Sequence, residues 1–182
     1  IQPPLYYFLL HFWIALAGDS EFALRFLSLC FGVLTIPLMF ATARRLFNRN
    51  VAFIAAVLAM LSPLYVWYSQ EARMYTLITF LLLLSSYALL RALQPSPLPS
   101  PFRGEGVWWL AFALANIAAI YTHYFAFVVI AFQITFYVLR FSRPTFIRAL
   151  ISFITILAAF LPWLPFVITR LGQDVSYWRG AL

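Results

Sequence analysis

The chain has 182 residues, of which 65% are hydrophobic, 20% aromatic and 9% charged, and its mean hydropathy is +0.93. Soluble domains carry about 25% charged residues, so this composition excludes a soluble single-core protein. The net charge of +7 comes from twelve Arg in short clusters between apolar runs, which indicates membrane topology rather than a nucleic-acid-binding surface, and the single cysteine, Cys30, excludes an intrachain disulfide or a cysteine-based metal site.

The composition predicts an all-α, polytopic transmembrane helix bundle. Uncharged stretches of about 17 to 25 residues, the length that a bilayer-spanning helix requires, recur along the chain. We expect spans at residues 26–44, 51–69, 74–91, 107–122, 124–140 and 149–169. Residues 1–182 then belong to one transmembrane domain. Because the chain opens on Ile1 rather than Met and enters apolar sequence directly, without a charged leader region, we expect an internal fragment of a longer protein.

Residues 3–18, with the sequence PPLYYFLLHFWIALAG, precede the first predicted span. This stretch is short for a span and rich in aromatic side chains, which favour the membrane–water interface. It is either a short membrane helix or a helix that lies in the interface, and the pattern leaves both interpretations open.

The segment 94–106, QPSPLPSPFRGEG, has proline at alternate positions and cannot form a helix or join a sheet. We interpret it as an extended cytoplasmic connector. The uncharged stretch that follows, residues 106–139, would reach about 51 Å as one helix, well beyond the ~30 Å hydrocarbon core. We therefore expect two short helices that turn near YTHY, residues 121–124.

The arginines predict the orientation of the bundle. With six spans, eight Arg fall on one side and four on the other, and the Arg-rich side is expected to be cytoplasmic. Four of the five acidic residues fall on the opposite side: Asp19, Glu21, Glu71 and Asp174. A single span over 106–139 would remove the bias, which supports the hairpin.

The stretch SPLYVWYSQEARMY, residues 62–75, places Glu71 and Arg73 at the outer end of a span. Composition alone favours an aromatic belt with a snorkelling Arg and a solvated Glu. The alternative is a site at the mouth of the bundle, where an arginine fork holds a lipid-linked phosphate and a carboxylate fixes the arginine or orients a hydroxyl.

Two further polar residues lie on the same predicted side. His123, between two tyrosines, is typical of an interfacial hydrogen-bonding residue and is otherwise a candidate for a sugar contact. Arg25 is spaced to pair with Glu21 on one helix face. No spacing of His, Asp or Glu makes a metal signature, so no metal site is predicted.

The order of the motifs resembles the GT-C class of membrane glycosyltransferases, in particular the bacterial relatives of dolichyl-phosphate-mannose protein mannosyltransferases and lipid A aminoarabinose transferases (glycosyltransferase family 39-like). The motifs are, in order, PPLYYFLLHFW, GDSEFALRFLSLCFGVLTIPLMFATARRLF, SPLYVWYSQEARMYTL, YTHYFAF and LPWLPFV. Together they cover nearly the whole chain.

The resemblance implies an enzyme that transfers a hexosyl or pentosyl group from a polyprenyl-phosphate donor to a lipid, glycan or protein acceptor. Its place would be a bacterial inner membrane, among membrane lipids, with the site facing the periplasm or exterior. The family's general base is an Asp before the Pro-Pro segment, which we expect upstream of Ile1. The residues that match the family's motifs, which the resemblance implies bind substrate or lie beside it, are Pro3, Pro4, Tyr6, Tyr7, Arg25, Gln70, Glu71, Arg73, Tyr75 and His123.

The sequence departs from the resemblance at one position and leaves two points open. The family often has His or Lys directly before Pro-Pro, whereas this chain has Gln2, which puts a phosphate or metal contact there in doubt. No cofactor is predicted, and the use of a divalent metal stays open. The competing hypotheses are a transporter or flippase segment for a lipid-linked glycan, and a non-catalytic membrane scaffold. A transporter would need polar residues at the midplane, where Asn116 is the main one.

Overall fold

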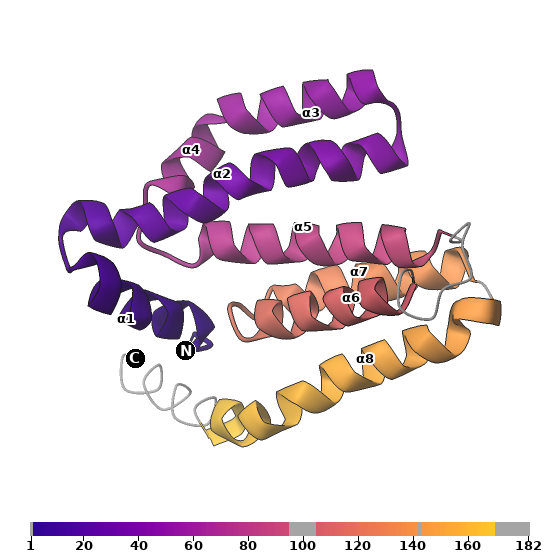
Figure 1. Ribbon diagram of the computed structural model, residues 1–182. Helices are drawn as coiled ribbons and strands as arrows, with labels where there is room; N and C mark the ends of the chain where they lie inside the picture. Colours follow the sequence, from indigo (N-terminus) through magenta and orange to yellow (C-terminus); the bar gives the residue numbers. More distant parts are fainter. Residues whose placement is uncertain (1, 95–104, 142, 170–182) are drawn as a thin grey trace, which may run out of the picture.

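The computed structural model describes residues 2–94, 105–141 and 143–169, and every regular element within these ranges is a helix. The helices are α1 (Leu5–Ala17), α2 (Glu21–Leu46), α3 (Arg49–Leu61), α4 (Pro63–Ser69), α5 (Tyr75–Ala92), α6 (Glu105–Ile120), α7 (Ala126–Leu139) and α8 (Phe146–Phe160). Single 3-10 turns at Arg143–Thr145 and Leu161–Trp163 flank α8. Figure 1 shows α3, α2, α5, the α6–α7 pair and α8 lying side by side along one direction. The predicted all-α bundle is confirmed.

The helices differ in whether they are long enough to cross a membrane. Among the described residues, three stretches qualify by length and composition, Glu21–Leu46, Tyr75–Ala92 and Arg143–Thr169, and a fourth does if α3 and α4 count as one bent span. Helices α6 and α7, at 16 and 14 residues, reach only about 24 and 21 Å, less than a ~30 Å hydrocarbon core. All six predicted ranges are therefore helical, but two of those helices are shorter than a full span.

The predicted span 51–69 is a helix broken at Ser62. Helix α3 ends there and α4 starts at Pro63 with its axis turned by 59°. Proline fits the first turn of a helix but cannot continue the one before it, which accounts for the break. Gly32 of α2 lets α4 approach closely, since a Cβ atom there would meet the Cβ of Ser69 at 2.9 Å.

The stretch 106–139 turns back on itself, as predicted. Helix α6 ends at Ile120 and α7 begins at Ala126, so the reversal lies in residues 121–125, at the YTHY motif. Residues 107–139 contain no proline or glycine that would mark this turn beforehand. Most of the proline-rich segment that precedes α6, residues 95–104, lies outside the described residues.

Helix α1 does not run through the bundle. At its start the amide of Leu5 donates to the carbonyl of Tyr121, in the α6–α7 turn, at 2.8 Å. At its end Gly18 adopts φ +83°, a conformation that suits glycine, and Ser20 caps α2 two residues later. Both ends of α1 therefore lie at the same end of the bundle (Figure 1), which favours the interfacial interpretation of residues 3–18.

A polar cluster lies in the core between α5, α6 and α7. The Gln133 amide donates to Ser85 Oγ at 2.8 Å and to Ser86 Oγ at 3.0 Å, and its oxygen accepts from Asn116 at 3.1 Å. Asn116 and Gln133 are almost fully buried. Buried amides need such partners in an apolar interior, so the cluster ties three helices together. Gln133 is a second deep polar residue that sequence reasoning missed.

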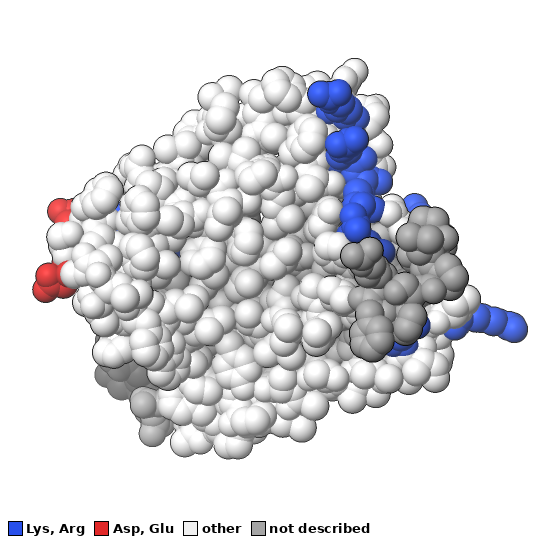
Figure 2. All heavy atoms as spheres, in the orientation of Figure 1, with Lys and Arg blue, Asp and Glu red and all other residues white. Residues whose placement is uncertain are grey.

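The charges separate to the two ends of the bundle. The arginine-rich end, formed where α2 passes to α3, α5 and α7 end and α8 begins, carries Arg44, Arg45, Arg49, Arg91, Arg140, Arg143 and Arg148. The acid-bearing end, formed by the turns around residues 18–20, 70–74 and 121–125, carries Asp19, Glu21 and Glu71 with Arg25 and Arg73. Figure 2 shows the cations and the acids at opposite edges of the molecule.

Candidate functional site

The loop between α4 and α5 carries the candidate site. Gln70 caps the end of α4, the amide of Arg73 donates to the carbonyl of Glu71 at 2.8 Å, and α5 begins at Tyr75. The buried Ser28 of α2 donates from Oγ to the carbonyl of Arg73 at 3.1 Å. This tight turn, anchored from α2, sets the direction in which the side chains of residues 70–73 leave the backbone.

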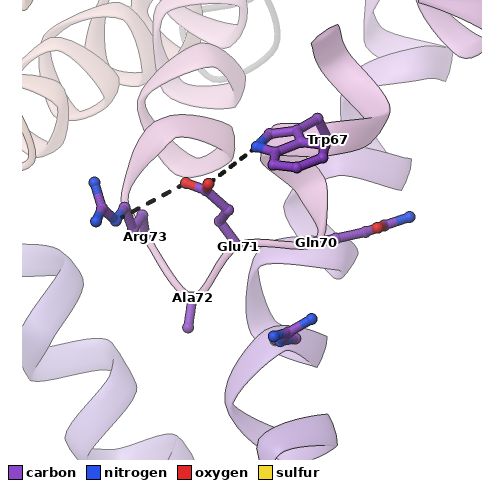
Figure 3. A pocket seen from close by; sticks show the side chains of 6 residues that line it. Trp67, Gln70, Glu71, Ala72 and Arg73 are labelled. Atoms are coloured by element: carbon purple, nitrogen blue, oxygen red, sulfur yellow. Dashed lines mark hydrogen bonds and ion pairs between the residues drawn. The ribbon is translucent and has the colours of Figure 1, made fainter. Parts of the chain in front are cut away.

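The loop opens on a surface hollow of about 500 Å³. Its lining comes from α2, α4 and the loop itself: Arg25, Trp67, Gln70, Glu71, Ala72 and Arg73. Figure 3 shows the Glu71 side chain between Trp67 and Arg73, with Gln70 extending away from both. Four of the eight predicted site residues therefore meet in one hollow: Arg25, Gln70, Glu71 and Arg73.

Glu71 is held from two sides. The indole N–H of Trp67 donates to its Oε1 at 3.1 Å, and Arg73 Nε lies 3.9 Å from its Oε2 (Figure 3). The carboxylate side chain is 34% exposed, so it is partly shielded from water. The indole N–H and the guanidinium therefore face the two oxygens of one carboxylate, which positions Glu71 beside Arg73.

Arg73 points its guanidinium towards solvent at the mouth of the hollow. Its side chain is 64% exposed, and its Nε is the guanidinium nitrogen that lies 3.9 Å from Glu71. The neighbouring Tyr75 hydroxyl, and to a lesser degree the Glu71 carboxylate, raise the pKa of Arg73 above its ordinary value. Arg73 therefore stays cationic at any physiological pH.

Arg25 brings a second guanidinium to the same hollow from the first turns of α2. Its Nη2 donates to Glu21 Oε1 at 2.5 Å, which is the predicted pair one helical turn apart. The Arg25 side chain remains 53% exposed and also lines the hollow. Arg25 can therefore form its ion pair with Glu21 and line the hollow at the same time. Two guanidiniums around one hollow are suited to a phosphate or a pyrophosphate group.

The two predicted tyrosines near the chain start have different surroundings. Tyr6 is 1% exposed, and its hydroxyl lies 3.0 Å from Ser28 Oγ, the same oxygen that bonds the Arg73 carbonyl. Tyr7 is half exposed and donates to the Gln2 side chain. Tyr6 is therefore a buried support beneath the loop, whereas Tyr7 is accessible at the surface. Pro3 is buried and Pro4 caps α1.

Tyr75 and His123 are at the same end of the bundle but outside the lining. The Tyr75 ring packs on Tyr68, with ring centroids 4.7 Å apart, and its hydroxyl side faces Arg73. His123 lies in the α6–α7 turn, where its Nδ1 accepts from the amide of Phe125 at 3.0 Å. Within the part of the chain that the structure describes, no group of three or more His, Cys, Asp or Glu side chains lies in reach of one metal ion.

Sequence reasoning missed two residues that shape the site. Trp67 was interpreted only as part of an aromatic belt, although its spacing of four residues from Glu71 was a signal for a contact on one helix face. Ser28 bonds a carbonyl 45 residues away and links Tyr6 to the loop. No local pattern marks a contact over that distance in the sequence.

Comparison with known proteins gives one match. The family model of the dolichyl-phosphate-mannose-protein mannosyltransferases matches residues 1–168, which is most of the 182-residue chain. No curated protein and no solved structure matches the chain. The matched range includes every residue that lines the hollow.

Proposed function

The chain belongs to the dolichyl-phosphate-mannose-protein mannosyltransferase family, and on that basis we propose that it transfers a sugar from a polyprenyl-phosphate donor to an acceptor at the outer face of its membrane. The family indicates a membrane glycosyltransferase of the GT-C type. The donor class, the side of the membrane and the roles of individual residues are the proposal.

The observation that carries the proposal is the hollow with two guanidiniums at its rim. A polyprenyl-phosphate sugar holds its phosphate at the level of the lipid headgroups, and the leaving phosphate gains negative charge as the glycosidic bond breaks. Preorganised cations aimed at that charge lower the barrier of such a reaction. Arg73, exposed and permanently charged, is the proposed phosphate ligand, and Arg25 is the second.

Glu71 is proposed as a positioning residue rather than as the base. Its two oxygens face Trp67 and Arg73, so its proposed role is to hold the guanidinium in place. The resemblance assigns the general base to an Asp before the Pro-Pro segment, upstream of Ile1. Gln70, exposed at the rim, is placed to hydrogen-bond a sugar hydroxyl.

Apolar side chains next to the hollow offer a path for the lipid tail. Phe22 is 73% exposed one turn before Arg25, and Leu64 is 67% exposed one turn before Trp67. We propose that these side chains face lipid, so that a polyprenyl chain lies along α2 and α4 while its phosphate reaches the guanidiniums. The arrangement fits a donor that is half lipid and half sugar phosphate.

The proposed orientation places the arginine-rich end in the cytoplasm and the hollow outside, in a bacterial inner membrane facing the periplasm. Seven arginines at one end of the described bundle provide the charge bias that sets the orientation of membrane proteins. Labelling of single cysteines introduced at Gln70 and at Arg143, in a Cys30→Ser background, tests this. A membrane-impermeant reagent added to spheroplasts should label position 70 and not position 143.

The decisive experiment measures transfer of labelled sugar by the full-length protein in membrane vesicles. Dolichyl-phosphate mannose, undecaprenyl-phosphate sugars and nucleotide sugars are supplied separately as donors. We expect label to move from a polyprenyl-phosphate sugar and from no nucleotide sugar. The double variant Arg25→Ala/Arg73→Ala should lose transfer, and Arg143→Ala, which removes a cation at the opposite end, should retain it.

Two outcomes would contradict the proposal. Transfer from a nucleotide sugar alone would exclude the donor class. Undiminished transfer by the Arg25→Ala/Arg73→Ala protein, inserted at the same level as wild type, would exclude the hollow as the phosphate site even if the donor class stands.

A further inference from the structure

A second groove lies near the opposite end of the bundle, on the face where α2 and α7 both pack against α5. It measures about 110 Å³, and its lining is mostly apolar: Thr42, Leu46, Ser86, Leu89, Leu90, Phe132, Gln133 and Phe136. Its floor is buried, with Leu89 at 2% and Gln133 at 3% exposure, whereas Phe132 at its rim is 71% exposed. The groove therefore opens sideways, towards the hydrocarbon of the membrane, and not towards the aqueous phase.

Two arginines near this groove are held over aromatic rings. The guanidinium of Arg140 lies over the ring of Phe136, a groove residue, at 5.7 Å from the ring centroid. Arg45, next to Leu46 in the chain, lies over the ring of Tyr87 at 5.6 Å and donates to the side chain of Gln94. Cation–π contacts hold a guanidinium by its flat face and do not use its N–H donors.

The size of the groove limits its occupant. Pockets for drug-sized molecules measure about 300 to 1,000 Å³, so a space of 110 Å³ is too small for a sugar or a headgroup. A segment of one hydrocarbon chain fits its narrow, apolar and laterally open form. A molecule with a hydrocarbon chain and an anionic group at the membrane surface would satisfy the groove and the arginines together.

We propose that this groove between α2, α5 and α7 binds an anionic phospholipid of the leaflet at the arginine-rich end, with one acyl chain in the groove and its phosphate on Arg140. The site is separate from the hollow at the acid-bearing end, and the inference does not depend on the proposed transfer reaction. The positive charge of the arginine-rich end favours an anionic lipid over a neutral one, and the groove determines where that lipid binds.

Lipid retention by the full-length protein tests this inference. The protein is reconstituted into vesicles of equal parts phosphatidylglycerol and phosphatidylcholine, extracted into a mild detergent, and its bound lipids are counted by native mass spectrometry. We expect one phosphatidylglycerol retained in preference to phosphatidylcholine. Removing one surface cation costs about 1 kcal/mol of attraction, so Arg140→Gln should lower retention about fivefold.

Two variants separate the groove from the general charge of this end. Arg140 lies over the groove residue Phe136, whereas Arg143 belongs to the 3-10 turn that precedes α8. Arg143→Gln removes the same charge there and should retain phosphatidylglycerol as wild type does. Leu90→Trp fills the groove with a larger side chain and should reduce retention of phosphatidylglycerol while every arginine remains. Thermal unfolding in the same detergent shows that each variant is folded.

Three results would overturn the inference. They are equal retention of the two lipids, an equal loss in Arg143→Gln and Arg140→Gln, and unchanged retention in a folded Leu90→Trp protein. The first would exclude charge selection, the second would reduce the effect to net charge, and the third would place the bound lipid elsewhere on the surface.

Discussion

Arginine side chains make different contacts at the two ends of the bundle. At the arginine-rich end, three guanidiniums lie over aromatic rings: Arg45 over Tyr87, Arg91 over Trp108 and Arg140 over Phe136. At the acid-bearing end, Arg25 and Arg73 lie against the carboxylates of Glu21 and Glu71. A ring supports the flat face of arginine without neutralising it, whereas a carboxylate balances the charge and sets the direction of the fork.

This difference fits the role proposed for each end. An end that sets orientation needs uncompensated positive charge at the membrane surface, and its exact geometry matters little. An end that binds a reacting phosphate needs a cation in one place, and a neighbouring carboxylate fixes that place. The following changes test whether the ends are as unlike as this comparison implies.

Removing the guanidinium at the acid-bearing end should have the largest effect. Arg73→Ala should lower kcat/KM for sugar transfer by about 10²- to 10³-fold, because loss of one preorganised donor to a developing negative charge costs that much. Arg143→Ala, at the other end, should change kcat/KM little. Initial rates with a polyprenyl-phosphate sugar measure both, and equal losses would show that the two ends act only through net charge.

Glu71→Gln should have a smaller effect on the same reaction. The amide keeps the size of the side chain but no longer attracts Arg73, and misplacing a catalytic group by about 1 Å can cost up to about 10²-fold in rate. Protein stability should hardly change, since exposed ion pairs contribute about 0 to 1 kcal/mol. A loss of stability that accounts for the lost rate would contradict the positioning role.

A change in the middle of the bundle should affect stability and leave the charges at both ends in place. Gln133→Leu removes the partner of Asn116 and of two serines, and hydrogen bonds between membrane helices average about 0.6 kcal/mol, with a maximum of about 1.7. Unfolding in detergent should detect a loss of that size. Asn116→Leu in the same background should add little, because its partner is already gone.

The pH dependence of donor affinity should show the smallest effect. Tyr75 and Glu71 raise the pKa of Arg73, so its charge is retained as the pH increases to 10. In Arg73→Lys the ordinary pKa is about 10.4, so roughly a quarter of the charge is lost at pH 10. The ratio of variant to wild-type donor affinity should therefore fall between pH 8 and 10. A ratio that stays constant would indicate that the charge at position 73 does not contact the donor.

Much of the fold could be predicted because apolar runs between charges specify membrane helices. The boundaries were less accurate where local contacts extend a helix. Helix α2 begins at Glu21 rather than at residue 26, because Ser20 caps it and Arg25 pairs with Glu21 in the first turns. The Ser-Pro pair at residues 62–63 marked the break in the span 51–69, and the prediction overlooked it.

The candidate site was predictable only in part. Arg25, Gln70, Glu71 and Arg73 were expected at one end of the bundle, and they share a hollow. Tyr6 was expected beside substrate but is buried in the core against Ser28. The support of the loop depends on packing between α1, α2 and the loop, and a pattern of residue types along the chain carries no information about that packing.

The bond from Ser28 to the Arg73 carbonyl has a consequence for how the family can diversify. Because the backbone of the loop is fixed from beneath by buried groups, the side chains at positions 70–73 can change without altering the path of the chain. Proteins whose function resides in side chains on a rigid support acquire new specificities through few substitutions. Under the role proposed for Gln70, exchanging that residue while Ser28 and Tyr6 are kept is the shortest route to a protein that accepts a different sugar.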